Sequence, residues 1–217
     1  MNFEQAREEV VSTCLLLADK GYLAGTGGNV ACRIDDEYFA ITPSATDYYA
    51  MRPDDICVLR LNNLCQVAGD RRPSVELRLH ANVLLKRRDC GASIHTHQPI
   101  ASAYTLLRRD LEVEDPCHRA VLGPKAALVD YAPSGTSWLA SKLSKILRPE
   151  IHAYLMRNHG VVCCGPTLSE TVARVQALEA ECTAFFLRSI GTRTSREPYL
   201  SEVMRLLEGI AEVEFAK

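Results

Sequence analysis

Two histidines separated by one residue stand in the segment Gly91–Pro99, GASIHTHQP. The segment is short and apolar, and it is bounded by glycine and proline, which favours a strand. Residues i and i+2 of a strand point to the same face, about 6.5 to 7 Å apart, so that two imidazoles can converge on one ion at about 2.0 to 2.1 Å. His95 and His97 therefore fit a metal site, with two ordinary core or surface histidines as the alternative, and Thr96 should face the other way.

A metal held by protein side chains needs a third ligand. His159 is the leading candidate, because it precedes Gly160 at the junction of two expected strands, where the chain can turn sharply. The competing histidines are His80, His118 and His152. Glu76 lies four residues before His80 in an expected helix, so the two side chains share a face. A carboxylate in the first turn of a helix is also stabilised by the helix dipole.

The elements that position these residues follow from the apolar spacing and the capping residues. Helices are expected at 3–20, from an N-cap at Ser74 to 88, from Gln98 or Pro99, at 135–147, from a capping box at Thr167 to 191, and at 199–214. Strands are expected at 29–34, 38–42, 56–61, 64–67, 92–97, 152–158 and 161–164, with a two-residue hairpin turn at Asn62-Asn63 and a loop at 111–124. This order predicts an α/β (α+β) fold around one mostly antiparallel sheet.

Composition limits the classes of partner. A chain of 217 residues without repeats or low-complexity segments predicts a single domain over 1–217. The formal net charge of −2 gives no electrostatic reason to bind nucleic acid or an anionic membrane, so a small-molecule partner is expected. There is no signal segment and no apolar run long enough to span a membrane, which predicts a cytoplasmic protein. The nine scattered cysteines fit a reducing compartment.

Five segments, taken in order, resemble the class II aldolase/adducin family. They are GTGGNVACR, ITPSATD, RRPSVELRLH, IHTHQP and RNHGVVCCGPTLSE, and the resemblance runs from about Val10 to about Gly191. The resemblance implies a three-layer α/β/α sandwich with a central, mainly antiparallel sheet. It also implies a homotetramer with active sites at the subunit interfaces.

For the chemistry, the resemblance implies a site for Zn²⁺, with Mn²⁺ or Co²⁺ as alternatives, at His95, His97 and His159. Glu76 is implied as a further metal ligand in the empty enzyme and as the base that transfers a proton once substrate displaces it. Removal of a proton next to a carbonyl gives an enediolate, which a carboxylate can generate only if a Lewis acid holds the developing charge.

A phosphate pocket is also implied by the resemblance. Its residues are Thr26, Gly28, Asn29, Ser44, Ala45 and Ser74. Many sugar-phosphate aldolases of the family have glycine where Ala45 stands and a second serine where Val75 stands. Some use a tyrosine of the neighbouring subunit as the acid that protonates the aldehyde. This chain has Pro-Cys-His-Arg near that place, so His118 is the candidate acid.

The resulting functional prediction is a zinc-dependent aldehyde-lyase. It would reversibly cleave a ketose phosphate or a related sugar derivative to an aldehyde and a ketone of the dihydroxyacetone-phosphate type. The alternatives on the same metal site are a sugar-acid decarboxylase, a dehydratase of the methylthioribulose-phosphate type and a pentulose-phosphate 4-epimerase. A non-catalytic binding module like adducin is a further alternative, but the chain retains all four implied metal ligands.

Overall fold

The computed structural model describes residues 1–23, 25–191 and 202–208. Within these residues nine strands form one sheet in the order β4-β3-β2-β1-β5-β9-β8-β7-β6. The strands are β1 (Asn29–Arg33), β2 (Tyr38–Ile41), β3 (Cys57–Arg60), β4 (Gln66–Ala68), β5 (Ala92–Thr96), β6 (Leu111–Glu112), β7 (Lys125–Val129), β8 (Ala153–Met156) and β9 (Val161–Gly165). Strands β7 and β8 are parallel, and the other described neighbours are antiparallel.

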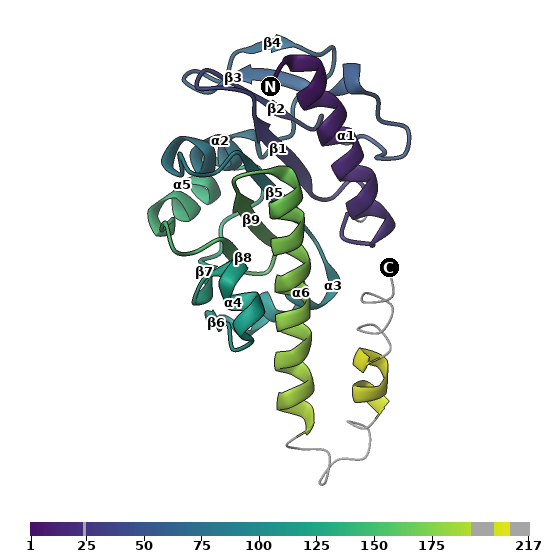
Figure 1. Cartoon of the computed structure of the whole chain (residues 1–217), viewed down its shortest axis with the longest axis vertical. Helices are drawn as coiled ribbons and strands as arrows, with labels where there is room; N and C mark the ends of the chain where they lie inside the picture. The colour runs from purple at the N-terminus through teal and green to yellow at the C-terminus, as the bar shows by residue number, and fades with distance from the viewer. Residues whose placement is uncertain (24, 192–201, 209–217) are drawn as a thin grey trace.

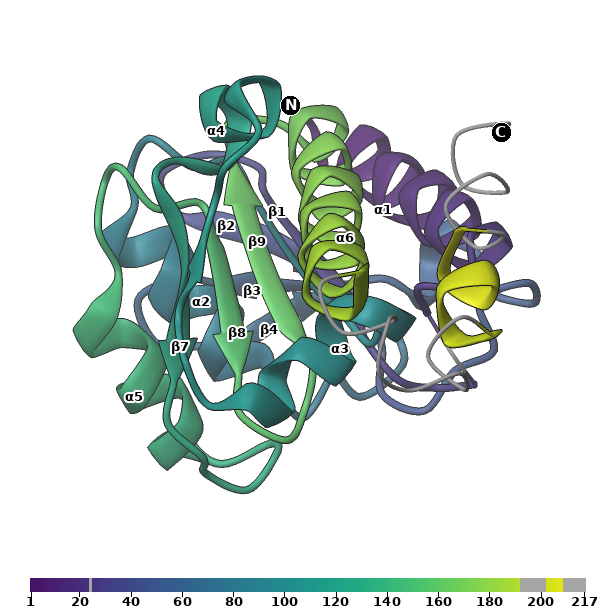
Figure 2. The ribbon, with the colours of Figure 1, turned by 90° about the horizontal axis from the view of Figure 1, so that it is seen from below.

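Helices cover both faces of this sheet (Figure 1). They are α1 (Phe3–Asp19), α2 (Leu77–Lys86), α3 (Pro99–Tyr104), α4 (Pro116–Leu122), α5 (Ser137–Ile146) and α6 (Leu168–Gly191), with short 3₁₀ turns η1 (Pro53–Asp55) and η2 (Thr105–Leu107). Helices α1 and α6 pack together on one face, whereas α2 and α5 pack together on the other, as Figure 2 shows. The predicted α/β/α sandwich with a mainly antiparallel sheet is confirmed.

Strand β5 shows how the sheet sorts its side chains. Ala92 and Ile94 join the apolar cluster that includes Val10 of α1 and Leu178 of α6. Ser93 points to the opposite face, where its hydroxyl lies 2.8 Å from Nδ1 of His80 in α2. This alternation of period two places His95 on the same face as Ser93, toward α2.

Two capping motifs fix the ends of the long helices. Helix α1 begins with a capping box, in which the side chain of Asn2 accepts from the backbone N–H of Gln5 and Gln5 accepts from Asn2 in return. Helix α6 follows Thr167, whose hydroxyl accepts from the backbone N–H of Glu170, which is one half of the predicted capping box. The side chain of Glu170 accepts from the Thr167 hydroxyl at 3.4 Å, instead of from the backbone N–H that would complete the box. These caps satisfy N–H groups that have no partner within the helix.

The predicted hairpin turn at Asn62-Asn63 is wrong. Strand β3 ends at Arg60 and β4 covers Gln66–Ala68, not 64–67, so residues 61–65 connect the two strands. The backbone N–H groups of Arg60 and Leu64 close this longer turn by donating to the carbonyls of Cys65 and Arg60. Leu64 has a positive φ of 62°, which the apolar pattern of the sequence did not indicate.

Two other local predictions need correction. Helix α2 starts at Leu77, with Glu76 and not Ser74 at the N-cap position, because the hydroxyl of Ser74 accepts from the N–H of Glu76 in a turn before the helix. The expected loop at 111–124 contains β6 and α4, and β7 follows it at once. Asp115 caps α4 by accepting from the N–H groups of residues 117 and 118, a signal for a helix start that the prolines obscured.

The C-terminal part is described over residues 202–208, which are helical. The rest of the helix expected at 199–214 lies outside the described residues. Among the helices of the described chain, none is long and apolar enough to cross a membrane.

Candidate metal centre and substrate pocket

Three imidazoles converge at the end of β5. His95 is the fourth residue of that strand, His97 follows it, and His159 lies in the turn between β8 and β9. One nitrogen of each ring lies within 4.8 Å of the others, and Nε2 of His95 and Nε2 of His97 are 2.9 Å apart. Among the histidines that competed for the third position, His159 is the one that joins the pair.

Gly160 lets the three rings come this close. A Cβ atom at residue 160 would lie 2.4 Å from the carbonyl oxygen of Thr96 and 2.6 Å from Cδ2 of His97. The turn that presents His159 is closed by backbone hydrogen bonds from His159 to Met156 and from Met156 to Gly160. A side chain at Gly160 would therefore occupy the space into which the imidazoles pack.

The protonation of His95 suits a metal ligand. Nδ1 of His95 is 2.8 Å from the carbonyl oxygen of Val161, and since a carbonyl only accepts, Nδ1 carries the proton. The lone pair is then on Nε2, which faces the other rings. Burial lowers the pKa of His95 to about 3. Burial also lowers the pKa of His97, and the neighbouring His159 adds to this effect. Both rings are neutral at neutral pH, as zinc binding requires.

Glu76 completes the cluster. Its Oε2 is 3.3 Å from Nε2 of His95, and its Oε1 is 3.7 Å from Nε2 of His159. The amide of Asn29 donates to Oε2 at 3.0 Å, and the hydroxyl of Ser134 donates to Oε1 at 2.9 Å. Burial raises the pKa of the Glu76 carboxyl, but the hydrogen bonds from Asn29 and Ser134 favour its ionised form, and the pKa lies below its ordinary value. Glu76 is thus a held, ionised carboxylate at the three imidazoles.

Ser134 was not found from the sequence. It belongs to the loop between β7 and α5, a polar Ser-Gly-Thr stretch that is also typical of ordinary turns. The pairing of β7 with β8 and the packing of α5 against α2 bring this loop next to the carboxylate.

The pocket beside the imidazoles has a volume of about 120 Å³. All the implied substrate-binding residues line it, namely Thr26, Gly28, Asn29, Ser44, Ala45 and Ser74. Val75 also lines this pocket, although 64% of the residue is exposed. No lysine or arginine of the described chain is among the lining residues, and the polar groups that this chain offers there are backbone N–H groups, hydroxyls, an amide, the imidazoles and Glu76.

His118 does not reach this pocket within one chain. It lies in α4, where Nδ1 is 2.9 Å from Oε2 of Glu181, a fully buried residue of α6. His152 likewise lies elsewhere, next to the guanidinium of Arg87 at 3.0 Å. The structure therefore separates the candidate acid from the three clustered histidines of the same chain.

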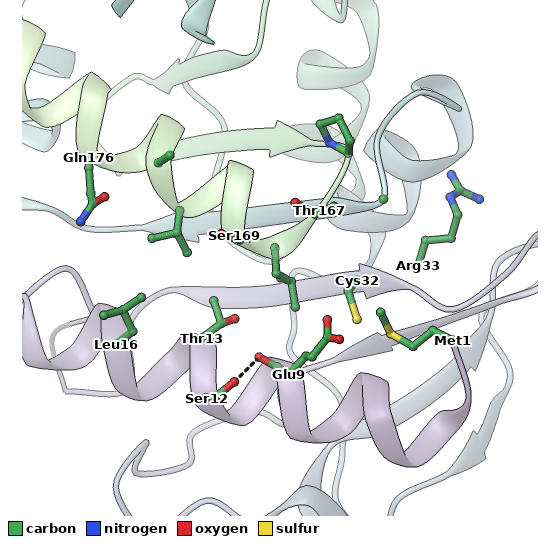
Figure 3. Close-up of a pocket in the computed structure, with 15 residues that line it drawn as sticks. Met1, Glu9, Ser12, Thr13, Leu16, Cys32, Arg33, Thr167, Ser169 and Gln176 are labelled. Carbon is green, nitrogen blue, oxygen red and sulfur yellow. Dashed lines mark hydrogen bonds between the residues drawn. The ribbon is translucent and has the colours of Figure 1, made fainter.

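A larger cavity of about 850 Å³ lies between α1 and the start of α6 (Figure 3). Figure 3 shows Glu9, Ser12 and Thr13 of α1 on one side, and Ser169 and Gln176 of α6 on the other. Of the described residues that line it, none is a histidine or an aspartate, and Glu9 is the single carboxylate. The three clustered histidines and Glu76 all line the smaller pocket.

Comparison with known proteins places the chain in a family. A sequence profile described as the class II aldolase and adducin N-terminal domain matches residues 8–186. An L-fuculose phosphate aldolase of Methanococcus maripaludis is 32% identical over 170 residues, which cover 78% of this chain and 89% of that protein. A 5-deoxy-D-ribulose 1-phosphate aldolase of Bacillus thuringiensis is 32% identical over 163 residues, which cover 75% of each protein. The chain belongs to the class II aldolase and adducin family.

A solved structure supports the same assignment. An L-fuculose 1-phosphate aldolase matches with a TM-score of 0.78 and 28% sequence identity, and the match covers 94% of each chain. Relatives named as aldolases confirm the prediction of an enzyme of the lyase class.

Proposed function

We propose that this protein is a zinc-dependent aldehyde-lyase acting on a ketose phosphate or a related sugar derivative. The observation that carries the proposal is the convergence of three imidazoles and one held carboxylate at a small pocket. The names of its relatives, which are aldolases of deoxy-sugar phosphates, support it. The products would be an aldehyde and a ketone of the dihydroxyacetone-phosphate type.

His95, His97 and His159 would hold the metal, with Glu76 as a further ligand in the absence of substrate. The donor set fits zinc, because neutral imidazoles and a carboxylate are common zinc ligands, and because the Val161 carbonyl fixes the tautomer of His95. When bound, the ion would supply a Lewis acid that stabilises the negative charge developing on a substrate oxygen. Mn²⁺ or Co²⁺ are alternatives for the same residues.

Glu76 would move the proton. In the condensation direction it accepts a proton from the carbon next to the ketone carbonyl, and in the cleavage direction it returns that proton. Its hydrogen bonds from Asn29 and Ser134 hold the carboxylate in place and keep it ionised. A general base must be ionised and oriented before substrate arrives, and Glu76 meets both conditions.

The pocket would bind the anionic end of the substrate through Thr26, Gly28, Asn29, Ser44, Ala45 and Ser74. Val75 has no hydroxyl to donate, and the loss of one hydrogen bond to a charged group costs about 1.5 to 3 kcal/mol. A phosphate would therefore be held less tightly than by a serine at residue 75.

His118 would serve as the acid in a neighbouring subunit of a homotetramer. Within its own chain Nδ1 of His118 is bonded to Glu181 and the ring lies outside the metal pocket. Donation of a proton to the aldehyde oxygen therefore requires that α4 of one subunit lies at the pocket of another. The nine cysteines, all free thiols, agree with the cytoplasmic location that we propose.

The role of Glu76 can be tested by exchange of the α-proton of dihydroxyacetone phosphate in D₂O, followed by NMR. We expect Glu76→Gln to retain bound metal and to abolish the exchange, because an amide cannot accept the proton. Glu170→Gln, at an exposed glutamate of α6, is the matched control and should exchange at the wild-type rate. Unchanged exchange in Glu76→Gln would exclude Glu76 as the base.

The reaction itself can be tested with ketose 1-phosphates, ketose 5-phosphates and 3-keto sugar acids. Aldehyde release from a ketose 1-phosphate is expected for the aldolase. Release of CO₂, loss of water or formation of an epimer without aldehyde would instead identify a decarboxylase, a dehydratase or an epimerase on the same residues.

A further inference from the structure

A chain of buried polar side chains lies behind the Glu76 carboxylate. The Ser93 hydroxyl is 2.8 Å from Nδ1 of His80, and Nε2 of His80 is hydrogen-bonded to Oδ1 of Asn29. Nδ2 of Asn29 in turn donates to Oε2 of Glu76 at 3.0 Å. Ser93 and His80 have no exposed surface, and Asn29 is 6% exposed. Buried polar groups of this kind persist only when each is hydrogen-bonded.

The direction of every hydrogen bond in this chain follows from the carboxylate. An ionised Glu76 only accepts, so the amide nitrogen of Asn29 faces it and the amide oxygen faces His80. His80 must then carry its proton on Nε2. Burial lowers the pKa of His80 to about 4, so the ring is neutral and Nδ1 accepts from the Ser93 hydroxyl. All three donors point toward Glu76, an arrangement in which each bond polarises the next.

The strands place this series of hydrogen-bonded side chains beside the three clustered histidines. Asn29 of β1 is directly opposite His95 of β5, and Ser93 lies two residues before His95 on the same face. His80 comes from α2, the helix that follows Glu76. One helix and two paired strands thus connect the carboxylate to the same part of the sheet that presents the first imidazole.

We propose that His80 is a positioning residue, which locks the amide of Asn29 so that its N–H group holds the Glu76 carboxylate in the orientation needed for proton transfer. This inference rests on the proposed role of Glu76 as the base. If the ring is removed, Oδ1 of Asn29 loses its buried donor and the amide can rotate. The oxygen of a rotated amide would face the carboxylate and repel it.

A purely structural role would not need an imidazole at residue 80. The neighbouring buried residues of α2 are apolar, with Leu79, Ala81 and Leu84 in the core. An apolar side chain of similar size would fill the space without placing a polar ring in the interior. The ring is required only if the orientation of Asn29 matters.

The test compares His80→Leu, His80→Gln and Ser93→Ala in the full-length zinc-loaded protein. We expect His80→Leu to lower kcat for α-proton exchange of dihydroxyacetone phosphate about 10- to 100-fold, with KM changed less than 3-fold and one zinc per chain retained. His80→Gln should recover at least a third of the wild-type kcat, because its amide can donate to Asn29 and accept from Ser93. Ser93→Ala should lower kcat about 2- to 5-fold.

Two controls separate a positioning role of His80 from a general loss of packing or of stability. His152→Gln removes a histidine that contacts Arg87 outside the site, and it should leave kcat unchanged. In an Asn29→Ala background, His80→Leu should lower kcat by less than 2-fold, because the amide through which His80 acts on Glu76 is already absent.

Wild-type kcat in His80→Leu, or a full additional loss in the Asn29→Ala background, would overturn the positioning role. If His80→Leu does not fold, Ser93→Ala decides, and a wild-type kcat in that variant would also overturn it. Failure of the proposed function is recognised separately, since Glu76→Gln would then exchange the α-proton at the wild-type rate.

Discussion

Replacement of Gly160 by alanine is a steric test of the metal centre. A Cβ atom at residue 160 would lie 2.4 Å from the Thr96 carbonyl oxygen, 2.6 Å from Cδ2 of His97 and 3.0 Å from Cε1 of His95. Non-bonded heavy atoms prefer separations of about 3.5 Å, so the turn must move away from β5 by about 1 Å. The carbonyl belongs to the backbone of a central strand and cannot rotate away.

We expect Gly160→Ala to weaken metal binding while the protein remains folded. Ligand distances in a zinc site are held to within about 0.2 Å, so a displacement of about 1 Å separates His159 from the other two rings. We expect zinc affinity to fall about 100-fold, which corresponds to about 2.8 kcal/mol. Overpacking should lower the free energy of unfolding of the metal-free protein by about 1 to 3 kcal/mol.

Competition of the metal-free protein with a chromophoric chelator measures this affinity, and circular dichroism confirms that the variant is folded. Gly191→Ala is the matched control, because a Cβ atom there meets only Cε of Met204, at 3.9 Å, among the described atoms. Wild-type zinc affinity in a folded Gly160→Ala protein would refute the inferred crowding of the three imidazoles.

Three other substitutions test separate parts of the structure. Ala45→Gly should raise the free energy of unfolding in urea by about 0.5 kcal/mol. Ala45 has a φ of 51°, and the left-handed conformation costs a residue with a Cβ atom about 1 to 2 kcal/mol, which exceeds the entropic cost of ordering a glycine. A loss of stability would contradict this. Burial depresses the pKa of His80 to about 4 from 6.5, so the unfolded chain binds that proton first as the pH falls. Wild type should then lose about 3 kcal/mol more than His80→Gln between pH 6.5 and 4, whereas parallel curves would show that His80 is not buried as a neutral ring. Arg87→Leu removes donors to the carbonyls of residues 148, 149 and 151 and should cost about 3 kcal/mol in thermal unfolding, whereas the exposed Arg88→Leu should cost little; equal effects would contradict a specific role of Arg87.

The convergence of His95, His97 and His159 could be predicted because its signal is local. The spacing of His95 and His97 needs only the two-residue period of a strand, and Gly160 marks the turn that presents His159. Glu76 was singled out by its spacing to His80, but its place beside the three imidazoles was implied only by the family resemblance. These residues lie within a few positions of the elements that orient them.

The other parts of the site depend on contacts across the sheet. Ser134 reaches Glu76 over a separation of 58 residues, and Asn29 reaches it over 47, so no window of the sequence contains both partners. Ser134, which donates to the carboxylate, also follows β7. The sequence did not reveal this strand because it comes directly after a proline-containing helix and loop. The proposed role of His118 in another subunit's site would depend on an assembly, which no local pattern of the sequence can indicate.

The metal content of the purified protein tests the proposed centre most directly. Elemental analysis after exhaustive dialysis should find about one zinc ion per chain in the wild type and none in His95→Ala, with His152→Ala retaining the wild-type content. Wild-type protein that contains no transition metal and binds none when zinc is supplied would contradict the assignment of the three imidazoles as metal ligands.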